Sequence, residues 1–165
     1  MNTKIKFNII DLINASGCFD LQFRKDTRHE RTNSPTYYRW KIQFVVAVQK
    51  EDIKKLEHIK KAFDCGKISQ GAGQARFSVQ DIDDISDVVI PYFAKNRLAD
   101  TKKKDFELWK KAVEIIHKNK GRYILKWKKS DLLSVIEIHK SSLKYKENPR
   151  PSKWIQMAQD LAKTI

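Results

Sequence analysis

Oxygen-bearing side chains lie close together in residues 7–19, where an apolar helical run leads into a strand. Asp11, Asn14 and Ser16 fall in the helical part, and Gly17 ends it. A hard cation such as Mg²⁺ prefers the negative oxygens of carboxylates and phosphates, because a neutral hydroxyl supplies no charge to offset the cation's dehydration. The amide of Asn14 and the hydroxyl of Ser16 therefore make the end of this helix a poor place for such a cation.

The same segment carries a resemblance to a known family. Residues 11–19 read Asp-Leu-Ile-Asn-Ala-Ser-Gly-Cys-Phe, which resembles the motif of the LAGLIDADG homing endonucleases, Gly-(Phe/Leu)-(Ile/Val)-Asp-(Gly/Ala)-(Asp/Glu)-Gly-x-Phe. Residues 101–109 are similar to a second family pattern, Thr-Lys-Lys-x-Asp-Phe-x-x-Trp, which ends here at Trp109. The resemblance implies that Asn14 and Ser16 stand at the two acidic positions of the motif, and that Lys102 or Lys103 matches a lysine near the scissile phosphate. It therefore implies a member without the family's metal site.

Asp11 stands where the family has its first glycine. Two such helices pack face to face in the family, between subunits or between halves of one chain. Two carboxylates brought to a tight dyad repel each other unless one is protonated or both are paired. Asp11 therefore either faces solvent at the side of the helix or weakens the usual homodimer, which favours a monomer or a heteromer.

The charge of the chain indicates its partner. The 165 residues include 34 Lys and Arg against 20 Asp and Glu, which gives a net charge of +14 and a pI near 9.8. Such an excess is expected of a protein that binds phosphate-rich polymers, and the alternatives are a membrane-surface binder or a merely soluble basic protein. Neither Cys18 nor Cys65 has a zinc-ligand spacing. With no apolar run of membrane-spanning length and no hydrophobic signal core at residues 1–4, we expect an organelle (mitochondrion or chloroplast) or the bacterial cytoplasm.

Hydrophobic periodicity predicts a helix over 5–16, strands over 18–26 and 37–49 joined by a polar loop, a helix over 51–63, and a hairpin over 67–80. Residues 44–48 are all apolar, which means either burial on both faces or a one-residue bulge, and alignment with the family favours the bulge. A helix begins at Asp81, and Pro91 is expected to break it. Lys102 and Lys103 are then expected in a loop before a helix over 104–119.

This order of elements predicts an α+β fold, and it is also the αββαββα order of the LAGLIDADG family. The resemblance implies a domain over 1–120 with a four-stranded antiparallel saddle sheet, followed by a basic C-terminal helical extension over 121–165. In that extension the linker 144–151 offers Tyr145 among cations for stacking on a base. In the family, one face of the saddle lies in the major groove of DNA. By position, the residues of that face here are Gln22, Arg24, Arg28, Arg39, Lys41, Gln43, Lys67, Gln74, Arg76 and Ser78.

These observations predict a nucleic-acid-binding protein derived from a homing endonuclease that has lost cleavage. The expected ligand is structured RNA, such as intron or ribosomal RNA in a ribonucleoprotein, or duplex DNA. No cofactor is expected. One alternative is an active, Mg²⁺-dependent DNA endonuclease acting as a homodimer, in which Asp11 or Asp20 supplies the missing carboxylate. The other is a structural protein-interaction module, suggested by the apolar run at 44–48.

Overall fold

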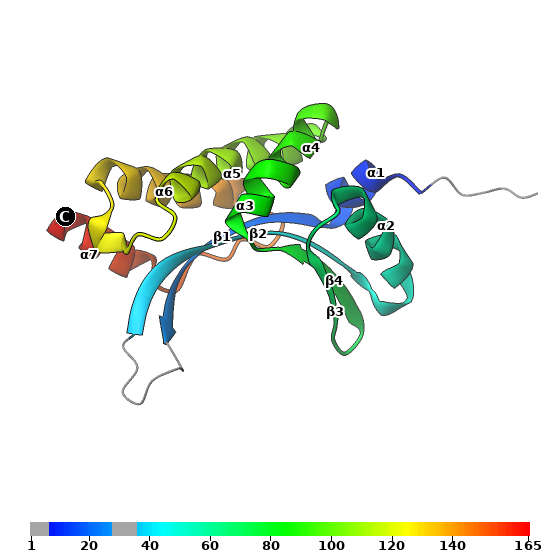
Figure 1. The fold of residues 1–165 in the computed structure, drawn as a ribbon, viewed down its shortest axis with the longest axis horizontal. Coiled ribbons are helices and arrows are strands. Elements are labelled where there is room, and N and C mark those ends of the chain that lie inside the picture. The colour runs from blue at the N-terminus through cyan, green and yellow to red at the C-terminus, as the bar shows by residue number, and fades with distance from the viewer. Residues whose placement is uncertain (1–6, 28–35) are drawn as a thin grey trace, which may run out of the picture. The chain divides into compact units, whose positions relative to one another are not determined.

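The computed structural model describes residues 7–27 and 36–165. The predicted loop after the first strand, with Arg28, lies outside the described residues. The chain begins with α1 (Ile9–Ser16), β1 (Gly17–Thr27), β2 (Thr36–Gln49), a 3₁₀ turn η1 (Lys50–Asp52), α2 (Ile53–Phe63), β3 (Lys67–Gln70) and β4 (Gln74–Val79), as Figure 1 shows. Next come α3 (Ile82–Asp84), the π-helical η2 (Ile85–Val89), α4 (Ile90–Lys95), α5 (Asp100–Lys118), η3 (Ile124–Lys126), α6 (Lys129–Ser142), η4 (Leu143–Tyr145) and α7 (Ile155–Thr164).

The four strands form one sheet in the order β1-β2-β4-β3. Strand β4 pairs antiparallel with β2 on one side and with β3 on the other. The order of helices and strands confirms the predicted α+β fold with helices after the αββαββα pattern. The chain divides into two compact units. Unit 1 comprises Met1–Phe19 and Gln43–Lys103, and unit 2 comprises Asp20–Ile42 and Lys104–Ile165.

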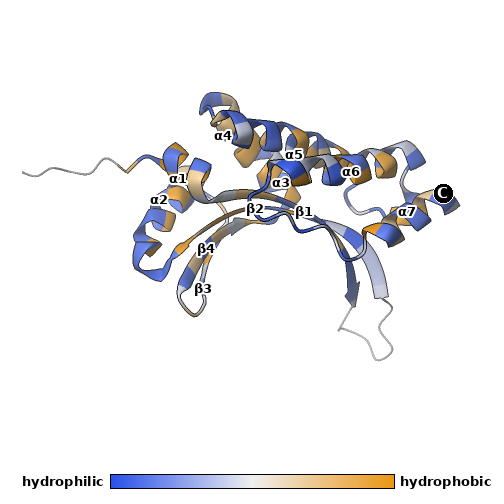
Figure 2. Cartoon of the chain, turned by 180° about the vertical axis from the view of Figure 1, so that it is seen from behind, coloured by the Kyte–Doolittle hydropathy of each residue, from blue (hydrophilic) through white to orange (hydrophobic). Residues whose placement is uncertain are grey.

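Unit 1 is built around phenylalanine rings. Phe44 of β2 contacts the rings of Phe19, Phe63, Phe77 and Phe93, with centroid distances of 5.4–6.3 Å. Helix α2 adds Leu56 and Ile59 on its buried side and keeps its lysines on the other, so hydrophobic and hydrophilic colours alternate along it in Figure 2. Aromatic pairs at these distances stabilise a core beyond the area they bury.

Unit 2 has its own core of larger rings. Phe23 of β1 stacks on Trp40 of β2 at 4.9 Å, and Trp109 of α5 donates its indole N–H to the carbonyl oxygen of Asp20 at 3.1 Å. Leu132 and Val135 of α6 are fully buried. Leu21 and Phe23 alternate with the more accessible Gln22 and Arg24 along β1 and are at most 3% exposed, as period-two reasoning from the sequence indicates.

The predicted bulge in β2 is wrong. Residues Phe44 to Gln49 pair one for one with Val79 to Gln74, so no residue is left over in this stretch. The other reading of the apolar run holds instead. Val45 and Val46 point to opposite faces of the strand and are 4% and 0% exposed, so β2 is buried on both faces here.

Pro91 does not break its helix, contrary to expectation. The preceding residues form the π-helical η2, in which the N–H of Ile90 donates to the carbonyl oxygen of Ile85. Pro91 directly follows this wider turn, as the second residue of α4, and the helix continues through it to Lys95. Helix α5 also begins earlier than predicted, at Asp100, so Lys102 and Lys103 lie in its first turns and not in a loop.

Candidate nucleic-acid interface

The end of the motif helix is tightly built. Asn8 caps the start of α1 by accepting hydrogen bonds from the N–H groups of Ile10 and Asp11. At the other end Gly17 has an ordinary extended backbone, with a φ of −79°. A Cβ atom at position 17 would lie 2.6 Å from the carbonyl oxygen of Ile13 and 2.8 Å from its Cγ2. Glycine is required here because the helix ends too close to the strand for a side chain.

The two degenerate motif positions lie next to α5. The Oδ1 atom of Asn14 accepts a hydrogen bond from the backbone N–H of Ala99 at 2.9 Å, immediately before α5 begins. The Nζ atom of Lys102 donates to the carbonyl oxygen of Gly17 at 2.6 Å. Asn14 and Ser16 are both half-buried. The structure thus places Asn14, Ser16 and Lys102 around one helix end, while Lys103 is exposed.

The donors at this helix end do not suit a divalent cation. Asn14 and Ser16 supply neutral oxygens, and the ammonium group of Lys102 lies on the Gly17 carbonyl and would repel a metal ion there. Asp11 is exposed in the first turn of α1, as both readings of this residue require. Within residues 7–27 and 36–165, no group of three or more His, Cys, Asp or Glu side chains is arranged to hold a metal ion.

In unit 1 the predicted sheet face is partly available. Lys67, Gln74 and Arg76 are exposed, and Arg76 of β4 lies opposite Ala47 of β2 and Ser69 of β3. Gln43 and Ser78, in contrast, are only 7% and 9% exposed. Both lie on the inner strands β2 and β4 of the sheet. Little of either side chain is accessible, so these two residues do not form part of an open surface as predicted.

In unit 2 most of the predicted face residues already have partners. Arg39 forms an ion pair with Asp26. Gln22 donates to the carbonyl oxygen of Arg150 at 3.1 Å and accepts from the hydroxyl of Ser152 at 2.8 Å. Lys41 is half-buried, and Arg24 is exposed. Of the predicted cations that the structure describes in unit 2, Arg24 and Arg39 are exposed, and Arg39 is paired with Asp26.

A buried histidine attaches the C-terminal segment to strand β1. The Nδ1 atom of His139 lies 2.9 Å from the carbonyl oxygen of Leu21, and Nε2 accepts from the N–H of Ser152 at 3.1 Å. The Ser152 hydroxyl in turn accepts from the N–H of Phe23 at 2.7 Å. Burial lowers the pKa of His139, and the nearby cations Lys146 and Lys140 act in the same direction, against the Leu21 carbonyl and Asp20. The neutral ring with its proton on Nδ1 satisfies both contacts.

We call residues 146–152 the C-terminal strap. Lys146 anchors its first end, because its Nζ lies 3.0 and 3.1 Å from the carboxylate oxygens of the buried Asp105. Sequence periodicity did not predict this strap. The signal available was His139, a polar residue on the buried side of α6. Tyr145, predicted to stack on bases, is half-buried with the ammonium of Lys144 over its ring at 5.1 Å.

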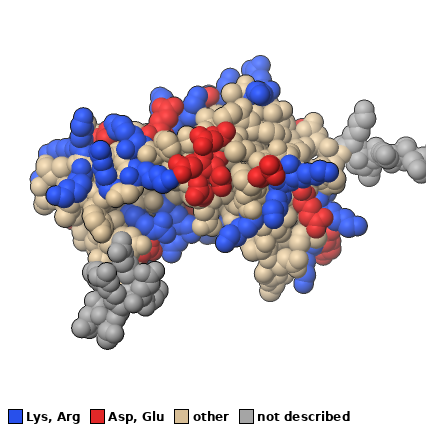
Figure 3. All heavy atoms as spheres, in the orientation of Figure 1, with Lys and Arg blue, Asp and Glu red and all other residues tan. Residues whose placement is uncertain are grey.

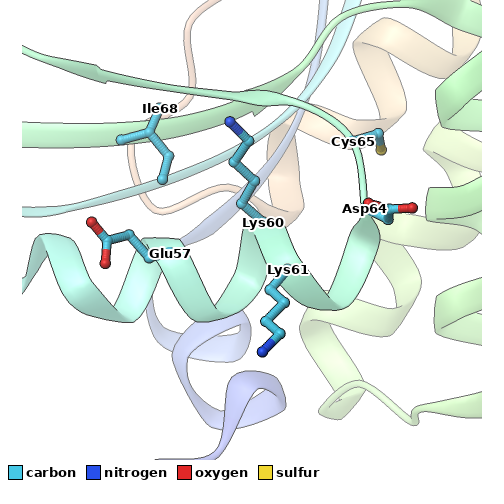
Figure 4. A pocket seen from close by; sticks show the side chains of 6 residues that line it. All are labelled: Glu57, Lys60, Lys61, Asp64, Cys65 and Ile68. Atoms are coloured by element: carbon cyan, nitrogen blue, oxygen red, sulfur yellow. The ribbon is translucent and has the colours of Figure 1, made fainter.

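Unit 1 also contains a pocket away from the predicted residues. Its volume is about 480 Å³, and Figure 4 shows its lining from α2 to the start of β3: Glu57, Lys60, Lys61, Asp64, Cys65 and Ile68. Burial and the carboxylates of Asp84, Asp64 and Asp81 raise the pKa of the Cys65 thiol, so the thiolate is disfavoured. The lining mixes both charges and offers no specific chemistry.

The helix–strand–strand repeat, with a glycine-ended first helix leading directly into the sheet, defines the class of protein. A family model described as LAGLIDADG endonuclease matches residues 11–113, which contain most of α1, all four strands and most of α5. The chain belongs to the LAGLIDADG endonuclease family, as the sequence motifs indicated. No helix among the described residues is long and apolar enough to cross a membrane.

The relatives include proteins and structures of several lengths. The "Probable intron-encoded endonuclease 3" of Neurospora crassa is 30% identical over 103 residues, which are 61% of this chain and 18% of that protein. Meganuclease I-SmaMI bound to uncleavable DNA has a TM-score of 0.70 and 22% identity, over 91% of this chain and 47% of that one. I-LtrWI bound to target DNA has a TM-score of 0.63 and 26% identity, over 81% and 42%. The chain thus spans about half of I-SmaMI and a fifth of the curated relative.

A third structure matches over nearly its whole length. The homing endonuclease I-TnaI has a TM-score of 0.67 and 15% identity, over 93% of this chain and 95% of that chain. At this identity the likeness concerns the fold alone.

Proposed function

We propose that this chain binds nucleic acid through the open face of its sheet and does not cleave it. The observation that carries the second half of the proposal is the end of α1. An amide and a hydroxyl occupy the motif's acidic positions, Asn14 is already bonded to Ala99, and the Lys102 ammonium lies on the Gly17 carbonyl. A site with one cationic side chain and no carboxylate favours phosphate over a metal ion.

The binding half of the proposal rests on charge and on the relatives. The net charge is +14, and exposed cations lie on the open face in both units, with Lys67 and Arg76 in unit 1 and Arg24 in unit 2. Two structures with the same fold are described as bound to DNA. On the sheet face of this chain, arginine and lysine would neutralise phosphates, and side chains at alternate positions, such as Gln74 and Arg76, would reach base edges.

The finer proposal concerns the ligand and the compartment. Structured RNA, such as intron or ribosomal RNA in a ribonucleoprotein, is our first choice, and duplex DNA is the second. The curated relative is named as intron-encoded, a setting that fits an organelle or the bacterial cytoplasm. Filter binding with folded RNA and with duplex DNA of equal length, over a range of salt concentrations, ranks the two ligands.

Cleavage is tested with randomised duplex DNA and either Mg²⁺ or Mn²⁺. We expect the wild-type chain to bind and to leave both strands intact. Calorimetric titration with Mn²⁺ alone should give no heat of specific binding. The double variant Asn14→Asp, Ser16→Asp restores a carboxylate at each of the two acidic positions of the motif. If Mn²⁺ binds that variant and not the wild-type chain, the family's metal site lies at the end of α1. Site-specific cuts by the wild-type chain would overturn the proposal.

The rival function is an active double-strand endonuclease, which family membership and the relatives' names favour. It requires a carboxylate from elsewhere. Asp20 is half-buried with its carboxylate 3.5 Å from the Gln22 amide, and Asp11 is exposed. Cleavage that is abolished by Asp20→Asn or by Asp11→Asn would establish this rival.

The third candidate function is a structural interaction module, and the structure does not support the observation that suggested it. It arose from the apolar run at 44–48, but Phe44, Val45 and Val46 are at most 4% exposed and Ala47 and Val48 are half-buried. The run fills the interior of unit 1 and offers little apolar surface to a partner.

A further inference from the structure

Two large apolar side chains project into solvent from a short turn in unit 2. Tyr123 and Leu125 are 62% and 60% exposed, although Ile124 between them is 6% exposed and Trp127 beyond them is 5% exposed. The turn is held by main-chain hydrogen bonds from Lys126 to Tyr123 at 2.8 Å and from Trp127 to Ile124 at 3.0 Å. Buried side chains therefore lie beside exposed ones on a backbone that hydrogen bonds hold in place. The phenol ring of Tyr123 is thus exposed to solvent from a defined position.

Hydrogen bonds to the residues that precede the turn close its base. The indole N–H of Trp127 donates to the carbonyl oxygen of Arg122 at 3.3 Å, and the N–H of Arg122 donates to the carbonyl oxygen of Asn119 at 3.0 Å. The turn is therefore attached by hydrogen bonds to the C-terminal end of α5. An aromatic ring on such a support loses little conformational entropy when it binds a flat partner.

Exposed cations flank Tyr123 closely along the chain. Arg122, Lys126, Lys128 and Lys129 are all exposed, and no acidic residue occurs between Glu114 and Asp131. The carboxylate of Asp131 is engaged locally, by Lys118 at 3.0 Å and by Asn119 at 3.2 Å. Figure 3 shows Lys and Arg atoms gathered at this end of unit 2, where Figure 1 draws residues 120–129 in yellow. We call Arg122, Tyr123, Leu125, Lys126, Lys128 and Lys129 the turn patch.

We propose that the turn patch binds unpaired nucleotides of RNA, with one base stacked on Tyr123 and the adjoining phosphates held by the surrounding cations. Base–aromatic stacking combined with a positive surface is how single-stranded nucleic acid is gripped without sequence preference. Folded RNA offers unstacked bases in its loops, bulges and ends, whereas the bases of a duplex are closed to a tyrosine. This second surface makes no use of the sheet residues, so the inference stands independently of the proposed function.

An acidic protein segment is the competing occupant of a basic patch. The structure favours nucleotides because the turn itself exposes just two large apolar side chains, Tyr123 and Leu125, separated by one residue, and one of them is aromatic. A protein interface is expected to offer a broader apolar centre. One flat ring with exposed cations close to it in sequence matches one base with its phosphates.

The test measures binding of a short, unstructured RNA by fluorescence anisotropy, with an RNA duplex of the same length as the second probe. We expect Tyr123→Ala to weaken single-strand binding about tenfold, the effect of losing one stacked base. Tyr123→Phe keeps the ring and should bind within about twofold of wild type. Duplex binding should be the same in all three proteins. Photocrosslinking of 4-thiouridine RNA should label a peptide that contains Tyr123.

Two charge variants complete the design. Lys126→Gln with Lys128→Gln should weaken single-strand binding, whereas Lys54→Gln with Lys61→Gln, on the exposed side of α2, removes equal charge elsewhere and should not. Wild-type affinity of Tyr123→Ala for the single strand would overturn the proposal. Equal losses by Tyr123→Ala on the single strand and on the duplex would also overturn it, because stacking on an unpaired base does not account for a loss on the duplex. The proposed function fails separately, through variants of the sheet face.

Discussion

At the scale of single residues, the motif helix keeps its shape and loses its charge. Gly17 is still needed, because a Cβ atom there would lie 2.6 Å from the Ile13 carbonyl oxygen. The acidic positions carry no such steric requirement, and Asn14 has a structural hydrogen bond to Ala99 instead. A fold can lose metal ligands without losing packing, since ligand chemistry and steric fit are set by different atoms.

The glycine requirement is testable. Gly17→Ala should lower the free energy of unfolding by about 1–3 kcal/mol, because α1 or β1 must shift to admit the methyl group. Gly71→Ala is the matched control. A Cβ atom at position 71 meets nothing within 4 Å and Gly71 is not among the residues with positive φ, so the change should stay within about 0.5 kcal/mol. Urea denaturation of both variants measures the difference, and equal effects would contradict the steric argument.

At the scale of elements, the C-terminal strap covers an edge of the sheet. Strand β1 ends the strand order, and its outward carbonyl of Leu21 and N–H of Phe23 are bonded by His139 and Ser152. An uncovered edge presents unpaired backbone groups to other chains. The terminal helix α7 begins at Ile155, after Ser152 has made its hydrogen bond to β1.

The histidine makes this attachment dependent on pH. The folded pKa of His139 lies below the ordinary value of 6.5, with burial as its main cause, so the unfolded chain takes up a proton first as the pH falls. Stability is therefore fully present above about pH 6.5. Below it, the free energy of unfolding should fall by about 1.4 kcal/mol per pH unit until the folded pKa is reached.

Denaturation of wild type and of His139→Gln between neutral and mildly acidic pH isolates this contribution. The variant should be less stable at neutral pH and should show a shallower pH dependence, because the amide does not titrate. His58→Gln, which removes an exposed histidine on α2, should keep the wild-type slope. Parallel curves for wild type and His139→Gln would contradict the assignment.

At the scale of the whole molecule, the charge of +14 sets how the chain meets a polyanion. Counterions released from phosphates make such binding strongly dependent on salt. Cations are exposed on the sheet strands and in the turn patch of unit 2, so charge alone does not define one surface. The exposed positions of Arg24 and Arg76 on β1 and β4 make them the best probes of the sheet face.

The sheet face is tested by Arg24→Gln with Arg76→Gln. Each lost phosphate contact should reduce the slope of log affinity against log salt by about 0.7–0.9, so the double variant should lose roughly 1.4–1.8 in slope. Lys54→Gln with Lys61→Gln has the same net charge and should keep the wild-type slope. The readout is filter binding of folded RNA and of duplex DNA. Equal slopes for the two double variants would show that the sheet face is not the interface.

Much of the fold was predictable because it depends on local patterns. Alternation placed Phe19, Leu21 and Phe23 inside, and turn glycines marked the hairpin between β3 and β4. The bulge was wrong because β2 is buried on both faces, which period-two reasoning does not reveal. Pro91 was misjudged because the helix continues through it, directly after a wider π-helical turn. The division at residue 120 into a domain and an extension stays a prediction.

The candidate site was predictable in composition and less so in exposure. The period-two pattern correctly placed Arg24, Lys67, Gln74 and Arg76 on accessible surface, but Gln43 and Ser78 are buried. Gln22 and Arg39 have acquired partners in unit 2. The stacking residue expected at Tyr145 is half-buried, whereas Tyr123 is the exposed ring.

The amino-acid sequence alone determined the family, the order of helices and strands, the positive charge and the missing carboxylates, because each follows from residue types and short spacings. Only the tertiary structure decided which polar groups remain accessible, that Lys102 reaches the end of α1, and that His139 fastens the strap to β1. Those contacts join residues 85 and 118 positions apart. Their formation depends on how the chain packs, which no local pattern encodes.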